Sequence, residues 1–551
     1  MRQITLSVAL DVKPENFERL GSMLDQLQTR AKATSDNGGV FADFLSNMSV
    51  LHFMSLSLFP GYDHDPLFVL EANFDGEPGP FWAQLEAAIG RELRECLKCC
   101  KPPRDERATL FDALTRVDPQ ESRAPLAPYF EACAVKPSVF HHGNRGMTRD
   151  RIMNEFALFC DLGEEIAAPG RRYRSLRATD VHRNMRASLI DKHAWLAAPA
   201  PLRIAPWDNF IDWLKLAFFA FGAVFVLSIP GLVLVLAAGH AKTQYFLALA
   251  AAFLLLAWRL RNIADLPPTT TKLNAFRLVP LLLPYLPYAV AFVALYWVVV
   301  SALGTPLSVL LRAPNWPPAW PAAWVAAWAG MLTWIGQALM SVPVTVVAVL
   351  VWLRTLERRD SSHDAPPVDP HFLREMAKRE DWIPQNHMGS IVLIKPGVLR
   401  AMLIRAGHLG LFLILRVQAQ ARDGYLGSMR TIHFAHWAFV SNKSRLLFFS
   451  NFDQTWESYL DDFIEKAHPG LTLAWSCGVG FPPARFLLFD GASRGRQFKE
   501  WARHSMAVSH FWYSAYKDLT TEQIERNYRI ALGLRKPTLT EKEAVAWLND
   551  L

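Results

Sequence analysis

The sequence predicts an α+β protein interrupted by an all-α membrane block. Two ferredoxin-like modules, related by an internal duplication, flank an insert of about four transmembrane helices. Three observations lead to this fold class: long uncharged apolar runs in the middle of the chain, a β-α-β-β-α-β order of periodicities in the flank before them, and short matches that recur in both flanks. The expected domains are 1–164 (first module), 165–208 (basic juxtamembrane linker), 209–355 (transmembrane block), 356–385 (linker) and 386–551 (second module).

The membrane block rests on four apolar runs. A helix needs about 20 apolar residues to cross the hydrocarbon core, where it satisfies its own backbone hydrogen bonds. The runs are Phe218–Ala238, Tyr245–Trp258, Leu278–Leu303 and Trp324–Leu353. These runs contain no acidic or basic side chain, which most ion and proton pathways require. A transporter is therefore disfavoured.

Loop charges predict the topology. Arginine and lysine gather between the second and third runs and after the fourth, whereas the other two loops hold only Lys242 and Arg312. The positive-inside rule then places both termini in the cytoplasm of a multi-pass protein, which we expect in a bacterial inner membrane. The formal charge of +7 fits cytoplasmic loops and lipid head groups better than nucleic acid.

The basic linker allows two interpretations. It is either a solvated basic helix or a segment attracted to anionic lipids, at about 1 kcal/mol per basic residue near the surface. The arginines concerned are Arg171, Arg172, Arg174, Arg177, Arg183 and Arg186.

Periodicity predicts the elements of the first module. Alternation of apolar residues indicates strands, and apolar residues three or four apart indicate helices. The expected strands are Ile4–Val12, Leu51–Phe59, Pro66–Ala72 and Ser138–His141, and the expected helices are Pro14–Arg30 and Phe81–Leu97.

Collinear matches between the flanks predict the duplication. Each match is short, but all occur in the same order along both flanks. They are Lys13-Pro14 with Lys395-Pro396, Leu51-His52-Phe53 with Ile432-His433-Phe434, Asn73-Phe74-Asp75 with Asn451-Phe452-Asp453, Cys99 with Cys477, and Thr148 with Thr520.

The C-terminal copy carries the motifs TIHFAHWAF, LLFFSNFDQ and YLDDF. They resemble a module of uncharacterised bacterial proteins, some of them membrane-bound, with the pattern H-F-A-R-W, L-L-F-x-S-N-Y-D-G and Y-L-D-D-F. His436 stands where the pattern has arginine, and Gln454 where it has glycine. This resemblance implies no particular activity. Paired ferredoxin-like modules are also similar in fold to the dimeric α+β barrels of dye-decolourising peroxidases and chlorite dismutases, a fold analogy that implies haem as a candidate cofactor.

Both central hairpins place a histidine opposite an asparagine when residues are counted outward from the turn. The candidate site residues are His433, Asn451 and Asp453 in the second module and His52, Asn73 and Asp75 in the first. Such a histidine can act in acid–base chemistry or bind a metal. Alternatively, it hydrogen-bonds the end of the hairpin while the aspartate caps the next helix. We favour the structural interpretation, because each copy must fold.

Other motifs are weaker. Cys96 and Cys99 form a lone C-x-x-C pair with His141 and His142 downstream, but a zinc site needs four ligands, so we expect free thiols and no metal. Phosphate-binding glycine loops and the G-x-S-x-G elbow are absent from the sequence. The apolar stretch Val398–Val417 is either a core helix or a helix lying in the membrane plane.

These observations predict a membrane-anchored protein whose paired cytoplasmic modules bind a small, lipophilic ligand or act as a scaffold. The alternative is a membrane-bound, haem-dependent oxidoreductase with its site between the modules.

Overall fold

The computed structural model describes residues 3–32, 47–61, 64–116, 124–168, 176–238, 242–264, 335–361, 370–381, 383–418, 423–426, 429–441 and 443–551, with the single positions 44, 173 and 421 between them. The chain divides into two compact units. Unit 1 comprises Met1–Asp212, Ser362–Pro482 and Ala492–Leu551, and unit 2 comprises Trp213–Ser361 and Pro483–Gly491. Apart from Pro483–Gly491, the described residues of both polar flanks therefore belong to one unit.

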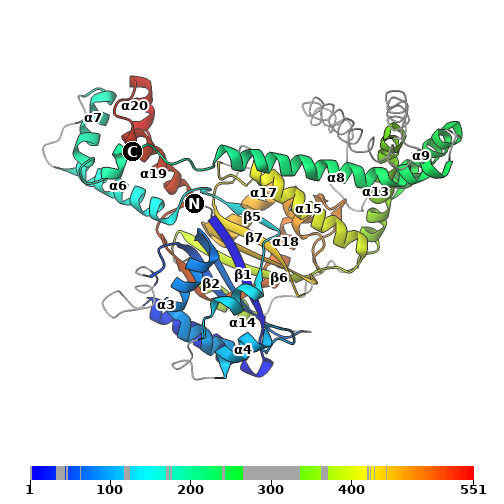
Figure 1. Ribbon diagram of the computed structural model, residues 1–551, viewed down its shortest axis with the longest axis horizontal. Helices are drawn as coiled ribbons and strands as arrows, with labels where there is room; N and C mark the ends of the chain where they lie inside the picture. The colour runs from blue at the N-terminus through cyan, green and yellow to red at the C-terminus, as the bar shows by residue number, and fades with distance from the viewer. Residues whose placement is uncertain are drawn as a thin grey trace, which may run out of the picture. The chain divides into compact units, whose positions relative to one another are not determined.

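Unit 1 is built on a curled antiparallel sheet (Figure 1). Among the described residues the sheet has nine strands in the order β4-β1-β3-β2-β11-β6-β8-β7-β5. The N-terminal flank supplies β1 (Gln3–Asp11), β2 (Leu51–Phe59), β3 (Leu67–Asp75), β4 (Ala134–Val135) and β5 (Val139–His142). The C-terminal flank supplies β6 (Gln385–Leu393), β7 (Ile432–Val440), β8 (Arg445–Asp453) and β11 (Met506–Ser514).

The flanks exchange their last strands. β5 of the N-terminal flank pairs with β7, and β11 of the C-terminal flank pairs with β2. The curl brings β1 close to the opposite end of the sheet, where Ser7 Oγ lies 2.8 Å from His436 Nε2 and Thr5 Oγ1 lies 3.3 Å from His142 Nε2. Separating the flanks would therefore break main-chain ladders as well as side-chain hydrogen bonds.

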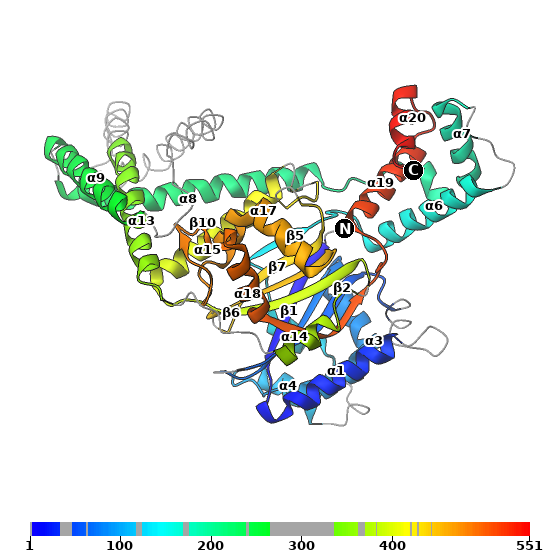
Figure 2. The same ribbon diagram turned by 180° about the vertical axis from the view of Figure 1, so that it is seen from behind.

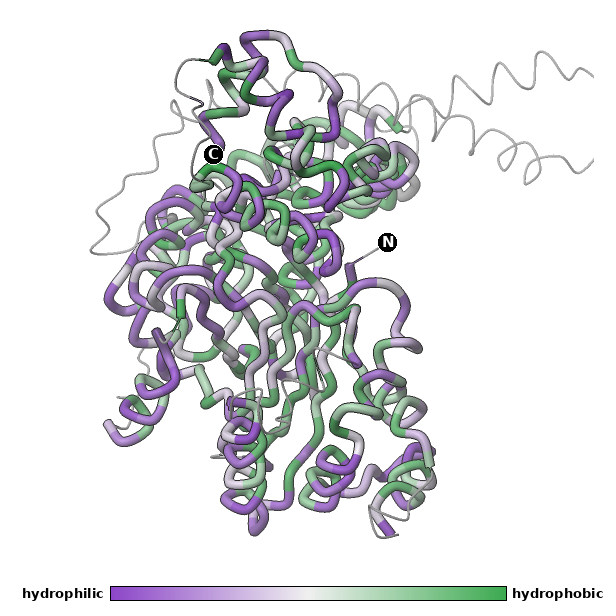
Figure 3. The backbone as a smooth tube through the Cα atoms, turned by 90° about the vertical axis from the view of Figure 1, so that its left-hand side faces the viewer, coloured by the Kyte–Doolittle hydropathy of each residue, from purple (hydrophilic) through white to green (hydrophobic). Residues whose placement is uncertain are grey.

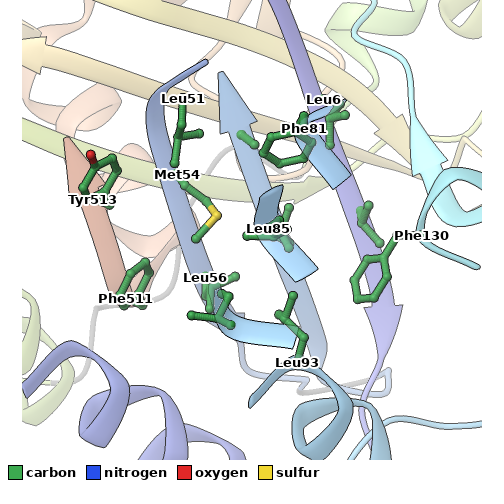
Figure 4. Close-up of a cluster of buried hydrophobic side chains, with 14 of the residues drawn as sticks. Leu6, Leu51, Met54, Leu56, Phe81, Leu85, Leu93, Phe130, Phe511 and Tyr513 are labelled. Atoms are coloured by element: carbon green, nitrogen blue, oxygen red, sulfur yellow. The ribbon is translucent and has the colours of Figure 1, made fainter. Parts of the chain in front are cut away.

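Helices cover the outer face of the N-terminal half of the sheet. These are α1 (Phe17–Lys32), α3 (Pro78–Lys98), α4 (Ala108–Thr115) and α5 (Ala127–Cys133). Figure 4 shows Phe81 and Leu85 of α3 in the same buried cluster as Met54 of β2, and all three side chains are almost fully buried. Many helical segments alternate between hydrophobic and hydrophilic residues in Figure 3, as expected of helices with one buried face.

The C-terminal half carries α15 (Val398–Val417), α17 (Trp456–Trp475) and α18 (Gly495–Ser505), which lie over strands β6 and β7 in Figure 2. Trp475 of α17 anchors this layer, with its ring 4.7 Å from Phe448 and 5.4 Å from Trp437. Helix α14 (Pro370–Ala377) precedes β6.

A separate helical cluster follows the last strand of each flank. It contains α6 (Arg149–Ala167), α7 (Ala178–Leu189), α19 (Thr521–Arg535) and α20 (Glu541–Leu548), which share a core. Helix α7 lies within the segment 165–208 that we expected to be a linker, and its Arg186 Nε donates to the Leu534 carbonyl oxygen. Arg177 and Arg183 are described, whereas Arg171, Arg172 and Arg174 lie outside the described residues.

Unit 2 holds the apolar helices α9 (Lys242–Ala264) and α13 (Val342–Arg358) and most of α8 (Pro206–Ala238). By length and hydropathy, four helices of the described residues could cross a membrane: Pro206–Leu234, Thr243–Ile263, Ile335–Arg358 and Val398–Val417. Two expected spans thus lie in α8 and α9, and the described part of the fourth lies in Ile335–Arg358. The expected span Leu278–Leu303 lies outside the described residues. The fourth helix that qualifies is α15, which belongs to unit 1.

A short hairpin from the C-terminal flank also belongs to unit 2. It consists of β9 (Ala484–Arg485) and β10 (Phe489–Asp490). Phe486 and Leu487, which lie between these strands, have positive φ angles of 54° and 58°. Residues other than glycine rarely adopt such backbone angles. The carboxylate of Glu357 in α13 accepts hydrogen bonds from both of their amides at 3.0 Å, and so holds this backbone against α13.

Candidate functional site

The candidate histidines form two buried His–Asp pairs. His433 Nε2 lies 2.8 Å from Asp453 Oδ1, and His52 Nε2 lies 3.1 Å from Asp75 Oδ2. The second oxygen of Asp453 accepts from the Thr521 amide at 2.8 Å at the start of α19. Asp75 Oδ2 likewise accepts from the Arg149 amide at 2.7 Å at the start of α6. Each aspartate therefore links a strand end to the next flank helix, as the structural interpretation requires.

The expected His–Asn register is wrong by one residue. Asn73 lies opposite Phe53, and Asn451 lies opposite Phe434. A bulge displaces each histidine from the ladder, between Leu51 and Phe53 in β2 and between Ile432 and Phe434 in β7. A bulge leaves its extra residue unpaired and redirects its side chain. The register error itself arises at the turns, where Phe59 pairs with Leu67 and Val440 with Arg445, so each turn is one residue longer than the count assumed.

Aromatic contacts bring the two pairs together. The rings of His52 and Phe434 lie 5.2 Å apart, and so do the rings of Phe53 and His433. Tyr516 completes the group, with its hydroxyl 2.9 Å from His52 Nδ1. The described residues provide no hydrogen-bond partner for His433 Nδ1.

The two asparagines belong to a different cluster, centred on Glu71 of β3. Asn73 Nδ2 donates to Glu71 Oε1, and Ser55 Oγ donates to Glu71 Oε2 at 3.2 Å. Asn451 also interacts with the Glu71 carboxyl group, and its Oδ1 accepts a hydrogen bond from the Trp512 indole N–H at 2.8 Å. Glu71 is completely buried, and its burial raises the pKa of this carboxyl to about 8 despite the hydrogen bonds. Glu71 is therefore mostly protonated at neutral pH.

Five aromatic rings form a ladder across five neighbouring strands beside Glu71. They are Phe53 (β2), Trp512 (β11), His387 (β6), Phe449 (β8) and His436 (β7). Successive ring centroids lie 6.5, 6.2, 5.5 and 5.8 Å apart, and successive planes differ by 18–29°. Burial lowers the pKa of His387 and of His436 to about 3, so both are neutral at physiological pH.

Each histidine of this ladder has a hydrogen-bond partner for only one of its two ring nitrogens. His387 Nδ1 lies 2.8 Å from Ser509 Oγ, and His436 Nε2 lies 2.8 Å from Ser7 Oγ. Within the described part of the chain, His387 Nε2 and His436 Nδ1 have no hydrogen-bond partner, although His387 Nε2 lies 3.9 Å from Glu71 Oε2. Buried polar atoms are almost always paired, with protein or with a bound molecule. These two ring nitrogens therefore remain available for hydrogen bonding within a buried polar cluster.

The remaining interior of the curl is apolar. Beyond the polar cluster, the two halves of the sheet pack through side chains that include Phe59, Val69, Ala438 and Leu447, all nearly inaccessible. A lipophilic ligand would have to displace these side chains.

Five of the six cysteines are buried free thiols, and Cys160 is exposed. Cys96 in the last turns of α3, and Cys99 and Cys100 just after this helix, are buried in the core, and burial raises the pKa of each thiol. Among the described residues, no group of three or more His, Cys, Asp or Glu side chains is arranged to hold a metal ion. His142 Nε2 instead lies beside Thr5.

The candidate histidines His52 and His433 and the ladder histidines His387 and His436 do not fit a haem. An axial ligand needs a ring nitrogen that faces open space wide enough for a porphyrin. His52 and His433 each direct Nε2 at an aspartate, and aromatic side chains surround their rings. The ladder histidines are stacked directly against Phe449.

No protein-family model, curated protein or solved structure matches this chain.

Sequence reasoning missed Glu71, His387 and Trp512 as site residues. One signal was available for Glu71. In LFVLEANFD it shares a strand face with Asn73 and Asp75, and an acidic residue inside a strand buried along its whole length is unusual. Nothing local identifies His387 or Trp512, because only the pairing of β6 and β11 with distant strands brings them here.

Proposed function

We propose that this chain is a membrane-anchored binding protein that encloses a small polar ligand around Glu71, inside the curled sheet. The observation that carries the proposal is the set of unsatisfied ring nitrogens, His387 Nε2 and His436 Nδ1, in a fully buried cluster with a protonated carboxyl group. A neutral carboxyl donates one hydrogen bond and accepts others, while neutral imidazoles add one donor or acceptor each. A ligand with both donors and acceptors would satisfy this set.

The two flanks are, in this proposal, copies of one ferredoxin-like module. Recurring pairs support this: Gln3 lies opposite Asp75, and Gln385 lies opposite Asp453. The strand orders β4-β1-β3-β2 and β11-β6-β8-β7 also correspond to each other. The ligand would then lie where the two copies meet, with Asn73 and Asn451 supplied by equivalent positions.

The membrane helices serve as the anchor. Strands β2 and β11 come from opposite flanks and pair with each other, so both flanks must lie on one side of the bilayer. The basic loops favour the cytoplasmic side, and the resemblance to bacterial modules favours an inner membrane. Arg177 and Arg183, with the other arginines of the linker, would attract anionic lipid head groups.

The proposal can be tested with Glu71→Leu and Glu71→Gln in the full chain. We expect the wild-type protein to release about one small polar molecule per chain on denaturing extraction, detected by mass spectrometry, and both variants to release much less. We also expect ligand-free Glu71→Leu to melt at a higher temperature, because a buried carboxyl without a charged partner is unfavourable.

Glu155→Gln is the matched control. Glu155 is also buried, but Arg151 Nε donates to it at 2.8 Å, so its loss should lower the melting temperature. A scaffold is the second candidate function, favoured by the apolar packing of the rest of the interior. If the wild type carries no molecule and Glu71→Leu is destabilised, the cluster is structural and the scaffold replaces the binding protein.

A further inference from the structure

Helix α15 is fastened to unit 1 along one side. His408 Nδ1 lies 2.8 Å from Ser138 Oγ, and its Nε2 lies 3.1 Å from the Ala474 carbonyl oxygen. Gly407 packs so closely on α17 that a Cβ atom there would come within 2.8 Å of Leu473. Although α15 has the length and hydropathy of a membrane span, it cannot cross a bilayer while these contacts persist.

The opposite side of α15 carries an exposed apolar stripe. Val398, Met402 and Leu409 are 74%, 57% and 47% exposed, and the basic Arg405 lies among them. These residues follow an i, i+4, i+7, i+11 spacing, which places them on one face of a helix. Such a continuous apolar face on an otherwise packed helix normally marks an interaction surface.

The end of α15 is tied to the beginning of membrane helix α8. Asp212 of α8 accepts from Arg416 Nε at 2.8 Å and from Arg145 Nη2 at 3.2 Å, and its side chain is buried. One turn earlier in α8, the exposed rings of Trp207 and Phe210 stack at 5.4 Å. Aromatic side chains at the start of a membrane helix are typical of the water–lipid boundary.

We propose that α15 lies in the plane of the membrane surface, with its stripe buried at the boundary between head groups and acyl chains. We infer that the bilayer covers the stripe, because the ion pair between Arg416 and Asp212 joins the end of α15 to the start of α8, the helix that enters the membrane. Arg405 would extend its aliphatic stem along the apolar stripe and place its guanidinium at lipid phosphates. This inference rests on the proposed membrane anchoring by α8.

The experiment uses the full chain with Cys160→Ser, because Cys160 is exposed and the other five cysteines are buried. Single cysteines at Met402 and Leu409 receive an environment-sensitive fluorophore, and the protein is reconstituted into vesicles of phosphatidylcholine and phosphatidylglycerol. Val545→Cys on α20, an exposed apolar position of similar accessibility, is the matched control. Phe218→Cys, in the expected span of α8, reports on the anchor itself.

We expect lipid-borne nitroxide to quench the labels at 402 and 409 about two-fold or more strongly than the label at 545, and aqueous iodide to show the reverse order. Labels at 402 and 409 that behave like the label at 545 would overturn the inference. If the label at 218 is also unquenched by nitroxide, the membrane anchoring has failed; if it is quenched, only the placement of α15 is wrong. Circular dichroism of each variant verifies that the chain is folded.

Discussion

The ring of His52 packs against the ring of Phe434 at 5.2 Å, with the planes 50° apart. Phe53 and His433 repeat the contact at the same distance and angle. Each pair joins a strand of one flank to a strand of the other. The two bulges therefore face each other across the sheet, and both His–Asp pairs contribute to the same junction.

The two aspartates should be the most sensitive positions of this junction. We expect Asp75→Ala and Asp453→Ala each to destabilise unit 1 by about 1–3 kcal/mol. Asp453→Ala leaves His433 and the Thr521 amide without their partner, and Asp75→Ala leaves the Arg149 amide without its acceptor and removes the carboxylate 3.1 Å from His52. Chemical denaturation in detergent measures the loss. Asp150→Ala, on the exposed side chain next to Arg149, is the control and should change little. Equal stabilities for all three variants would contradict the role assigned to the pairs.

The ring ladder should not tolerate a side chain at Gly389. A Cβ atom there would lie 2.4 Å from Cε1 of Phe449, whose ring is held between His387 and His436. We expect Gly389→Ala to lower stability by about 1–3 kcal/mol through overpacking. Gly163→Ala in α6 has nothing within 4 Å of the added Cβ, and it should stabilise by about 0.5–1 kcal/mol. A neutral Gly389→Ala would show that the ladder can shift freely.

Glu71 should make stability depend on pH. Its folded-state pKa of about 8 lies above the ordinary value of 4.5, so between these values the native state binds more protons than the unfolded state. Stability should therefore fall as pH rises through this window, by at most about 1.4 kcal/mol per unit. The neutral histidines oppose this trend only below about pH 6.5, where the unfolded state takes up their protons.

Between pH 6.5 and 8, the titration of Glu71 affects stability without the opposing contribution of His387 and His436. There, Glu71→Gln should be less dependent on pH than the wild type, as measured by urea denaturation at fixed ionic strength. Identical slopes for wild type and variant would mean that Glu71 is already ionised in the folded protein.

A disulfide can test the shared sheet directly. Ser57 of β2 lies opposite Ser509 of β11, and their hydroxyl oxygens are 3.1 Å apart. Directly opposed Cβ atoms suit a disulfide. We expect Ser57→Cys with Ser509→Cys to crosslink within one chain under mild oxidation, detected by peptide mass spectrometry. The pair Ser57→Cys with Ser514→Cys should remain reduced, because Ser514 lies opposite Phe53. A failure of the first pair would contradict strand exchange between the flanks.

Local pattern alone determined the elements. The alternation in LHFMSLSLF predicted a strand at Leu51–Phe59, which β2 matches at both ends, and the helical spacing of Phe81–Leu97 predicted most of α3. Uncharged apolar runs likewise predicted helices at α8 and α9. The direction of successive side chains depends only on the local backbone conformation, so the spacing of apolar residues in the sequence indicates a helix or a strand directly.

Tertiary structure alone decided the site. The exchange of β5 and β11, the bulges that turn His52 and His433 to their aspartates, and the ladder through Trp512 all depend on which distant strands share hydrogen bonds. The register differs from the expected one from the turns onward, where Phe59 pairs with Leu67 and Val440 with Arg445, and one residue is enough to move a side chain to the other face of a strand. Counting outward from a turn depends on the turn length, and the four hairpin strands do not reveal it, because they are buried along almost their whole length and show no exposed face that would fix the register.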